Sequence, residues 1–201
     1  MPLPTYDKSK RRTSFEQLPK GAYVIKIMGA KEDTWPSGDG VIKIAFDIAE
    51  GEYKGFYQNQ FDKNTNEDKQ WPYDAVFNLN IPNDGSQEYV WRDWNTFFAD
   101  LEDSNRGFVF DGDLKKLKGK VIGGKFHIKQ SKAKKPNDNG EYPVYSNTVM
   151  KYSCVAEDVR QGKAGKLPND VLLKDTPKPA SNSAGLDGFL SIPDGSEDEL
   201  P

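Results

Sequence analysis

Cysteine and histidine are almost missing from this sequence. Among 201 residues there is one cysteine, Cys154, and one histidine, His127. A single thiol can form neither an intramolecular disulfide nor a thiolate zinc cluster, and a single imidazole argues against a histidine-based metal site. The sequence therefore predicts a protein of a reducing compartment that binds no metal and no cofactor.

Long apolar runs are missing as well. No stretch approaches the roughly 20 apolar residues of a membrane-spanning helix. The first 15 residues contain no apolar segment typical of a secretory signal. The hydrophobic fraction is only 35%, so part of the chain is expected to lie outside any core. Aromatic residues make up 12%, however, which is too many for a wholly disordered protein.

Charges of one sign are missing from two segments. Residues 114–137 contain nine lysines and no acid, whereas residues 180–201 contain five acids and no base. This asymmetry suggests nucleic-acid binding. Together with the Pro- and Ser-rich composition near both ends, it predicts a flexible basic arm over residues 1–14, a folded domain over 15–170 and a disordered acidic tail over 171–201.

Hydrophobic periodicity predicts a mainly β domain with one helix. Apolar residues at spacings of three and four predict the helix from Val90, Trp91, Trp94, Phe97, Phe98 and Leu101. Residues 62–86 are polar and predict a long excursion. Alternating apolar and polar residues predict five strands, at 22–31, 41–48, 53–61, 120–129 and 144–155.

The order β-β-β-α-β-β matches the five-stranded Greek-key barrel of the OB-fold, although a split α+β sandwich would use similar elements. In such a barrel the helix packs beneath the sheet, and the binding face lies on the second and third strands. Gly123 and Gly124 inside a predicted strand suggest a bulge or a bend.

The lysines of residues 114–137 are candidates for contacts with a phosphate backbone, which releases counterions when it is neutralised. Lysines at the edge of a sheet also prevent aggregation and raise solubility, so a purely solubilising role is the alternative. The lysines predicted to bind are two on the fourth strand and three in the following hairpin loop: Lys125, Lys129, Lys132, Lys134 and Lys135.

Aromatic residues gather around the second and third predicted strands. Neighbouring residues on a strand face opposite sides, so Phe56 and Tyr57 cannot both lie in a core. Unpaired bases stack on exposed rings for about 1–3 kcal/mol each. The rings predicted to stack are Trp35, Tyr53, Tyr57 and Trp71. The alternative is that most of these rings pack the interior of the barrel.

Catalytic motifs are absent. The sequence contains no glycine-rich phosphate loop, no Ser/His/Asp set and no Cys/His pair, which predicts a protein that is not an enzyme. Asp47, Glu50 and Glu52 lie close in sequence and could hold Mg²⁺ for nuclease chemistry. A small metal-dependent nuclease is therefore kept as an alternative.

Several blocks of this sequence resemble a family of small proteins encoded by bacteriophages of Gram-positive bacteria. The blocks are residues 18–23, 46–55, 101–105 and 113–120, and the likeness extends over most of residues 15–175. Many members are taken to be single-stranded DNA-binding proteins of replication and recombination. The resemblance implies a non-enzymatic protein that binds single-stranded DNA in the host cytoplasm, either as a monomer or as a homo-oligomer.

The end of the sequence resembles the acidic tip of bacterial single-stranded DNA-binding proteins. That tip normally ends in Pro-Phe, and the terminal Phe is missing here. The resemblance implies docking of replication or recombination proteins, whereas a solubility tail is the plain alternative. A protein that redirects a host factor through this tail or through its aromatic surface is a further alternative. The residues predicted to bind a partner are Glu197, Asp198, Glu199, Leu200 and Pro201.

Overall fold

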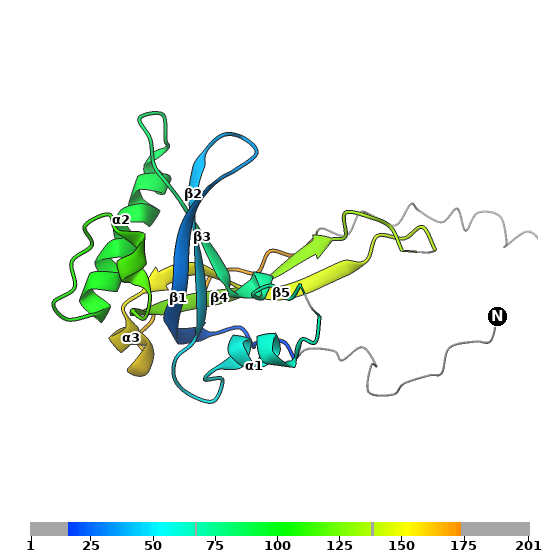
Figure 1. The fold of residues 1–201 in the computed structure, drawn as a ribbon, viewed down its shortest axis with the longest axis horizontal. Helices are drawn as coiled ribbons and strands as arrows, with labels where there is room; N and C mark the ends of the chain where they lie inside the picture. The colour runs from blue at the N-terminus through cyan, green and yellow to red at the C-terminus, as the bar shows by residue number, and fades with distance from the viewer. Residues whose placement is uncertain (1–15, 67, 138, 174–201) are drawn as a thin grey trace, which may run out of the picture.

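A computed structural model of the protein describes residues 16–66, 68–137 and 139–173 (Figure 1). Five antiparallel strands form one open sheet in the order β3-β2-β1-β4-β5. Their bounds are β1 Ala22–Thr34, β2 Gly40–Ile48, β3 Val76–Asn80, β4 Val121–Lys132 and β5 Val144–Cys154. The helices are α1 (Phe56–Lys63), α2 (Glu88–Ser104) and α3 (Ala156–Arg160), and two 3₁₀ turns are η2 (Tyr73–Ala75) and η3 (Leu114–Leu117). None of the helices in the described segments has the length and hydrophobicity needed to cross a membrane.

The mainly β class is confirmed, and so is the longest helix between the third and fourth strands. The position of the third strand was predicted wrongly, because residues 56–63 form α1. Asp47 explains this helix: its Oδ1 accepts a hydrogen bond from the Tyr57 backbone N–H at 2.9 Å, and its Oδ2 accepts one from Gln58 at 3.3 Å. A carboxylate that satisfies free N–H groups of the first turn stabilises a helix start. Residues 53–61 have the alternation typical of a strand, but the contact with Asp47 stabilises a helix there.

The true third strand, β3, lies inside the stretch predicted to be an excursion. Its sequence alternates: Phe77 pairs with Ile44 and Leu79 with Ile42. The alternate residues Asn78 and Asn80 point to the other side of the sheet. Because β3 has only five residues and polar neighbours, its alternation did not predict a strand.

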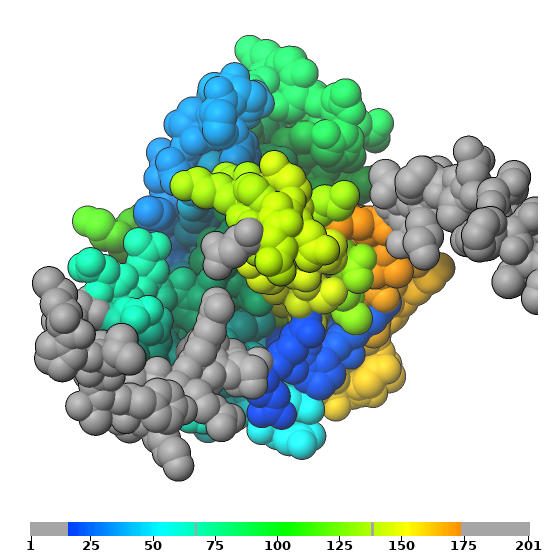
Figure 2. Space-filling model, turned by 90° about the vertical axis from the view of Figure 1, so that its right-hand side faces the viewer, coloured from blue at the N-terminus to red at the C-terminus, as the bar shows by residue number. Residues whose placement is uncertain are grey.

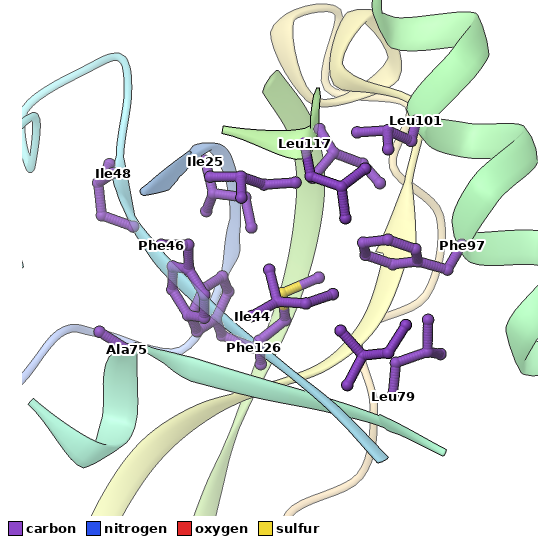
Figure 3. Packing of buried hydrophobic residues seen from close by; sticks show 14 of the residues in the cluster. Ile25, Ile44, Phe46, Ile48, Ala75, Leu79, Phe97, Leu101, Leu117 and Phe126 are labelled. Carbon is purple, nitrogen blue, oxygen red and sulfur yellow. The ribbon is translucent and has the colours of Figure 1, made fainter. Parts of the chain in front are cut away.

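The hydrophobic core lies between the concave side of the sheet and α2 (Figure 3). Ile25, Ile44 and Phe46 come from the sheet, whereas Phe97 and Leu101 come from α2, and each is at most 1% exposed. Burial of such side chains stabilises the fold by about 1.5–3 kcal/mol each. The core role predicted for the helix is confirmed for its C-terminal half. Trp91 departs from it, because 43% of this residue is exposed.

The irregularity predicted at Gly123-Gly124 is present close by. The β4–β5 register shifts between Lys125 and Phe126. A Cβ atom on Gly123 would lie 2.7 Å from Cys154 Sγ, and one on Gly124 would lie 2.9 Å from a ring carbon of Phe126. Glycine is therefore required here for the close approach of β4 to its neighbours.

The folded part continues beyond the predicted boundary at residue 170. The Val171 N–H donates to the Ile128 carbonyl at 2.9 Å, and the Gln130 N–H donates to the Val171 carbonyl at 2.8 Å. Residues up to Leu173 thus lie beside β4. The predicted arm at 1–14 and the rest of the predicted tail lie outside the described residues.

Candidate nucleic-acid interface

Three adjoining hollows share lining residues; two lie between the margin strands β3 and β5, and the third lies on the outer side of β4 and β5. Their volumes are about 630, 460 and 390 Å³. The first lies between β3, α2 and the inner ends of β4 and β5; the second lies between β3 and the middle of β4 and β5; the third lies beside the segment 166–171. Lys151 lines all three, so they form one depression. We call it the β3–β5 groove.

The β3–β5 groove is basic. Its charged lining residues include one carboxylate, Asp93. None of its cations takes part in a salt bridge among the described residues. The lining cations are Arg92, Lys125, Lys129, Lys151 and Lys166.

Aromatic rings line the same groove. Tyr89 on α2 is 50% exposed and Tyr152 on β5 is 45% exposed, and both border the first hollow. Tyr73 and Trp35 border the second. The Trp35 indole is held in place, because its Nε1–H donates to Asn80 Oδ1 at 2.9 Å. Rings that are fixed and accessible beside cations have the composition of a surface that stacks unpaired bases.

The bulge in the β4–β5 ladder builds part of this groove. Phe126 pairs with Met150 and Lys125 pairs with Tyr152, so Lys151 is the extra residue on β5. Consecutive residues of a regular strand face opposite sides of the sheet. Because of the bulge, Lys151 and Tyr152 both border the first hollow.

The outer half of the β4–β5 hairpin extends the groove face. Ser131 pairs with Tyr145, Lys129 with Asn147 and His127 with Val149, which sets these pairs on one face of the ribbon. His127, Lys129 and Val149 border the second hollow, so Tyr145, which is 52% exposed, continues the same face outward. Figure 2 looks onto this hairpin, which stands between the β1–β2 turn and the segment that ends at Leu173.

The groove contains three of the nine residues predicted to bind nucleic acid: Trp35, Lys125 and Lys129. Lys132, Lys134 and Lys135 are exposed on the hairpin, beyond the three hollows. Lys132 pairs with Val144, on the ribbon face opposite Tyr145. The lysine-rich stretch is therefore divided between the groove and the projecting hairpin.

The three other predicted rings lie away from the groove and pack against neighbours. Tyr57 is only 1% exposed, so its prediction as an accessible stacking ring is wrong. The Trp71 Nε1–H donates to the Phe46 carbonyl at 3.2 Å. Tyr53 meets Tyr23 edge to face, with ring centroids 5.9 Å apart. These rings pack against neighbours because residues 56–63 form α1 and not the strand that the sequence predicts.

Burial also sets the acid–base properties of this aromatic cluster. It raises the pKa of the Tyr57 hydroxyl, which finds no hydrogen-bond partner among the described residues. Burial raises the pKa of the neighbouring Asp74 to about 6. The surroundings of Tyr57 are therefore acidic, whereas the groove is lined by cations.

The sequence interpretation missed the groove residues Tyr89, Arg92, Lys151 and Tyr152. Tyr89 and Arg92 begin a helix that was interpreted as core. Lys151 and Tyr152 lie on a correctly predicted strand, but regular alternation would separate them. The one available signal was the Gly123-Gly124 pair, which lies close to the register shift between Lys125 and Phe126, although the extra residue of the bulge is on β5.

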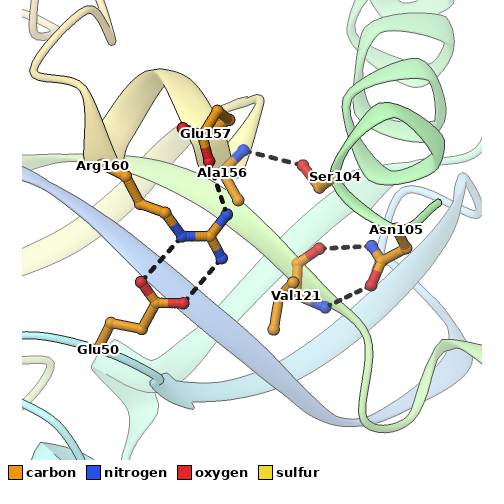
Figure 4. A network of polar contacts seen from close by, with 7 residues as sticks. All are labelled: Glu50, Ser104, Asn105, Val121, Ala156, Glu157 and Arg160. Carbon is orange, nitrogen blue, oxygen red and sulfur yellow. Dashed lines mark hydrogen bonds and ion pairs between the residues drawn. The ribbon is translucent and has the colours of Figure 1, made fainter.

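Two of the three carboxylates weighed for metal binding, Asp47 and Glu50, have structural partners. Asp47 caps α1, as described above. Glu50 accepts two hydrogen bonds from Arg160, at 2.8 and 3.0 Å, and so ties the end of β2 to α3 (Figure 4). Arg160 lowers the pKa of Glu50 by this hydrogen bonding. No cluster of three or more metal-ligating side chains occurs in residues 16–66, 68–137 and 139–173.

Further contacts in Figure 4 fix the end of α2 to β4 and to α3. The Asn105 side chain donates to the Val121 carbonyl and accepts from the Val121 N–H, at 2.6 and 3.1 Å. The Ser104 hydroxyl accepts from the Ala156 N–H at 2.9 Å. They hold the helix that forms one wall of the groove. The tail residues predicted to bind a partner, 197–201, lie outside the described residues.

Comparison with known families gives one match. Residues 4–80 match the family described as "Protein of unknown function (DUF669)". The matched stretch, less than half of the chain, includes β1, β2, α1 and β3 and ends at Asn80, on the β3 side of the groove. A search of curated proteins finds no match.

Proposed function

We propose that this protein is a non-enzymatic single-stranded DNA-binding protein that holds the strand in the β3–β5 groove. The observation that carries the proposal is the coincidence in one groove of five cations, one carboxylate and five aromatic residues, which are Trp35, Tyr73, Phe77, Tyr89 and Tyr152. Duplex DNA would satisfy the cations but leave the rings without partners, because its bases are already stacked. Unpaired nucleotides satisfy both.

The topology supports an OB-like barrel as the scaffold. In a partly open Greek-key barrel, the last strand of each sheet half comes to lie beside the other. Here β3 and β5 are the two margins of the sheet, and both line the same groove. The helix α2 lies between β3 and β4 in sequence, as it does in the OB-fold. The groove then corresponds to the gap between margins that have not closed.

Binding proceeds through two kinds of contact. Lys125, Lys129 and Lys151 neutralise phosphates and release counterions, which makes affinity fall with salt. Tyr89 and Tyr152 stack bases, which adds affinity with little dependence on sequence. Tyr145 on the hairpin lengthens the track for a longer strand. The resemblance to phage proteins favours a role in phage DNA replication or recombination, with partner proteins docking at residues 197–201.

The test is a titration of fluorescent oligonucleotides of equal length as single-stranded DNA, duplex DNA and RNA. The expected result is tightest binding to the single strand, with a log–log salt slope of about −0.7 for each phosphate neutralised. Absence of binding at low salt, or a preference for duplex DNA, would contradict the proposal. Incubation with Mg²⁺ checks the nuclease alternative, and we expect the oligonucleotide to remain intact.

A further inference from the structure

One polar group in the groove has a fixed orientation. Asn80, the last residue of β3, borders both the 630 and the 460 Å³ hollows. An indole N–H can only donate, so the atom that faces Trp35 at 2.9 Å must be the amide oxygen of Asn80. The amide NH₂ is then the other end of the group, and it is a pure donor.

The partner that fixes Asn80 is itself held. The backbone N–H of Trp35 donates to the Asp39 carbonyl at 2.8 Å, and the Trp35 carbonyl accepts from the Gly38 N–H at 2.8 Å. Next to Asn80, the Ile81 N–H donates to the Gly40 carbonyl at 2.9 Å. The β1–β2 turn and the end of β3 are thereby joined, and the amide is oriented before any ligand arrives.

The two sides of the second hollow differ in chemistry. Lys129 and Lys151 lie on the β4–β5 side, whereas Trp35, Tyr73 and Asn80 lie on the side of β3 and the β1–β2 turn. Phosphates are drawn to the cations, so the bases of a bound strand face the rings and the amide. A base at this position meets an NH₂ donor beside an indole.

We propose that Asn80, oriented by Trp35, makes the groove prefer pyrimidines with a carbonyl oxygen at position 4 over cytosine, which carries an amino group there. Uracil and thymine carry a carbonyl at position 4, which accepts from the Asn80 NH₂. Cytosine carries an amino group there, so two donors would face each other. The inference rests on the proposed function and adds a specificity-determining residue to it.

The experiment compares oligo-dU with oligo-dC of 15 nucleotides. These two pyrimidines are alike in size and lack the methyl group of thymine. They differ at the edge formed by positions 3 and 4, where uracil has an N–H and a carbonyl and cytosine has a bare nitrogen and an amino group. One hydrogen bond gained or lost predicts that the wild-type protein binds oligo-dU about threefold to tenfold more tightly. Asn80→Leu removes the donor and is expected to bring the ratio of the two affinities close to 1.

Trp35→Phe tests the orientation separately. It keeps an aromatic ring and removes the indole N–H, so the amide is free to turn its oxygen toward the base. The preference for oligo-dU is expected to shrink while binding persists. Asn95→Leu is the matched control: Asn95 is exposed on α2 but does not border the hollows, and the ratio should stay at the wild-type value.

The outcomes separate the two proposals. Equal wild-type affinity for both oligonucleotides overturns the base preference and leaves strand binding intact. Equal weakening of both by Asn80→Leu means that the amide contacts the backbone, which also overturns it. Failure of the wild-type protein to bind either oligonucleotide overturns the proposed function, and the preference with it.

Discussion

Two aromatic regions of this protein have similar composition and different surroundings. The α1 cluster (Tyr53, Phe56, Tyr57, Phe61 and Trp71) is packed ring against ring, with centroids 5.1–6.1 Å apart. The groove rings (Trp35, Tyr73, Tyr89 and Tyr152) border hollows that also contain lysines. The comparison teaches that accessibility of a ring depends on which elements cover it. Tyr152 lies on the margin strand β5, where no further strand covers it, whereas Trp35, Tyr73 and Tyr89 lie outside the sheet, on the β1–β2 turn, η2 and α2.

The charged groups around the rings also differ between the two regions. Tyr57 has Asp47 and Asp74 as its charged neighbours, and both raise the pKa of its hydroxyl after desolvation has done so. The groove has five cations around its rings. One cation, Lys69, lies over the Phe61 ring of the α1 cluster at 4.6 Å, whereas five cations line the groove and can attract a phosphate there. Ring and charge together, rather than ring alone, distinguish the candidate site.

The largest expected effect is on stability, in the α1 cluster. Tyr57→Ala removes a side chain that is 1% exposed and should lower the free energy of unfolding by about 3–5 kcal/mol. Tyr73→Ala, at a residue 70% exposed, should change it by less than about 0.5 kcal/mol. Urea denaturation measures both. A similar loss in the two variants would break the comparison.

Tyr57→Phe sharpens the same comparison. It removes a buried hydroxyl without a hydrogen-bond partner among the described residues and keeps the ring. The stability should therefore be unchanged or higher, by up to about 1–3 kcal/mol if the full cost of the unsatisfied group is recovered. A clear loss in urea denaturation would mean that the hydroxyl has a partner, such as a buried water.

The next effect is on binding, in the groove. Tyr152→Ala should weaken oligo-dT binding by about 1–3 kcal/mol through lost stacking, with little change in stability. Tyr142 is 53% exposed on the hairpin and outside the three hollows, so Tyr142→Ala is the matched control. Fluorescence anisotropy measures both affinities. If the control weakens binding as much as Tyr152→Ala, the hairpin and not the groove holds the strand.

A smaller effect is expected from single cations. Lys151→Ala should weaken binding by about tenfold at low salt and reduce the log–log salt slope by about 0.7. Lys118→Ala removes a lysine of the stretch 114–137 that lies outside the hollows, and its slope should equal that of the wild type. Equal slopes in both variants would show that overall charge matters more than the groove.

The smallest effect concerns pH. Burial raises the pKa of Asp74 from 3.8 to about 6, so the folded state binds a proton more tightly than the unfolded chain. Stability should then fall as pH rises from about 4 to 6, by about 1 kcal/mol once solvent screening is allowed for. Asp74→Asn should remove this dependence, as thermal unfolding at several pH values would reveal. An unchanged pH profile in the variant would contradict the assignment.

Much of the fold could be predicted from local pattern. β1, β2, β4, β5 and α2 each have a period that matches their structure over eight or more residues. β3 could not be placed, because five residues among polar neighbours give a weak signal and residues 53–61 gave a stronger one. A helix forms there instead, because Asp47, eight residues before Gly55, accepts a hydrogen bond from the first turn of α1.

The candidate site was predicted less completely, for a related reason. Lys125 and Lys129 lie on a strand whose register the sequence indicates. Tyr152 and Lys151 both border the groove because β5 has a bulge at Lys151. Tyr89 borders it because α2 packs against the sheet. Both depend on contacts between segments far apart in the sequence, which no local period encodes.

The most direct measurement is backbone NMR of the ¹⁵N-labelled protein titrated with oligo-dT. The account predicts that amide signals of Asn78, Lys151 and Tyr152 shift, whereas those of Tyr57 and Trp71 in the α1 cluster stay in place. Shifts confined to the α1 cluster, with the groove unchanged at saturating oligonucleotide, would contradict it.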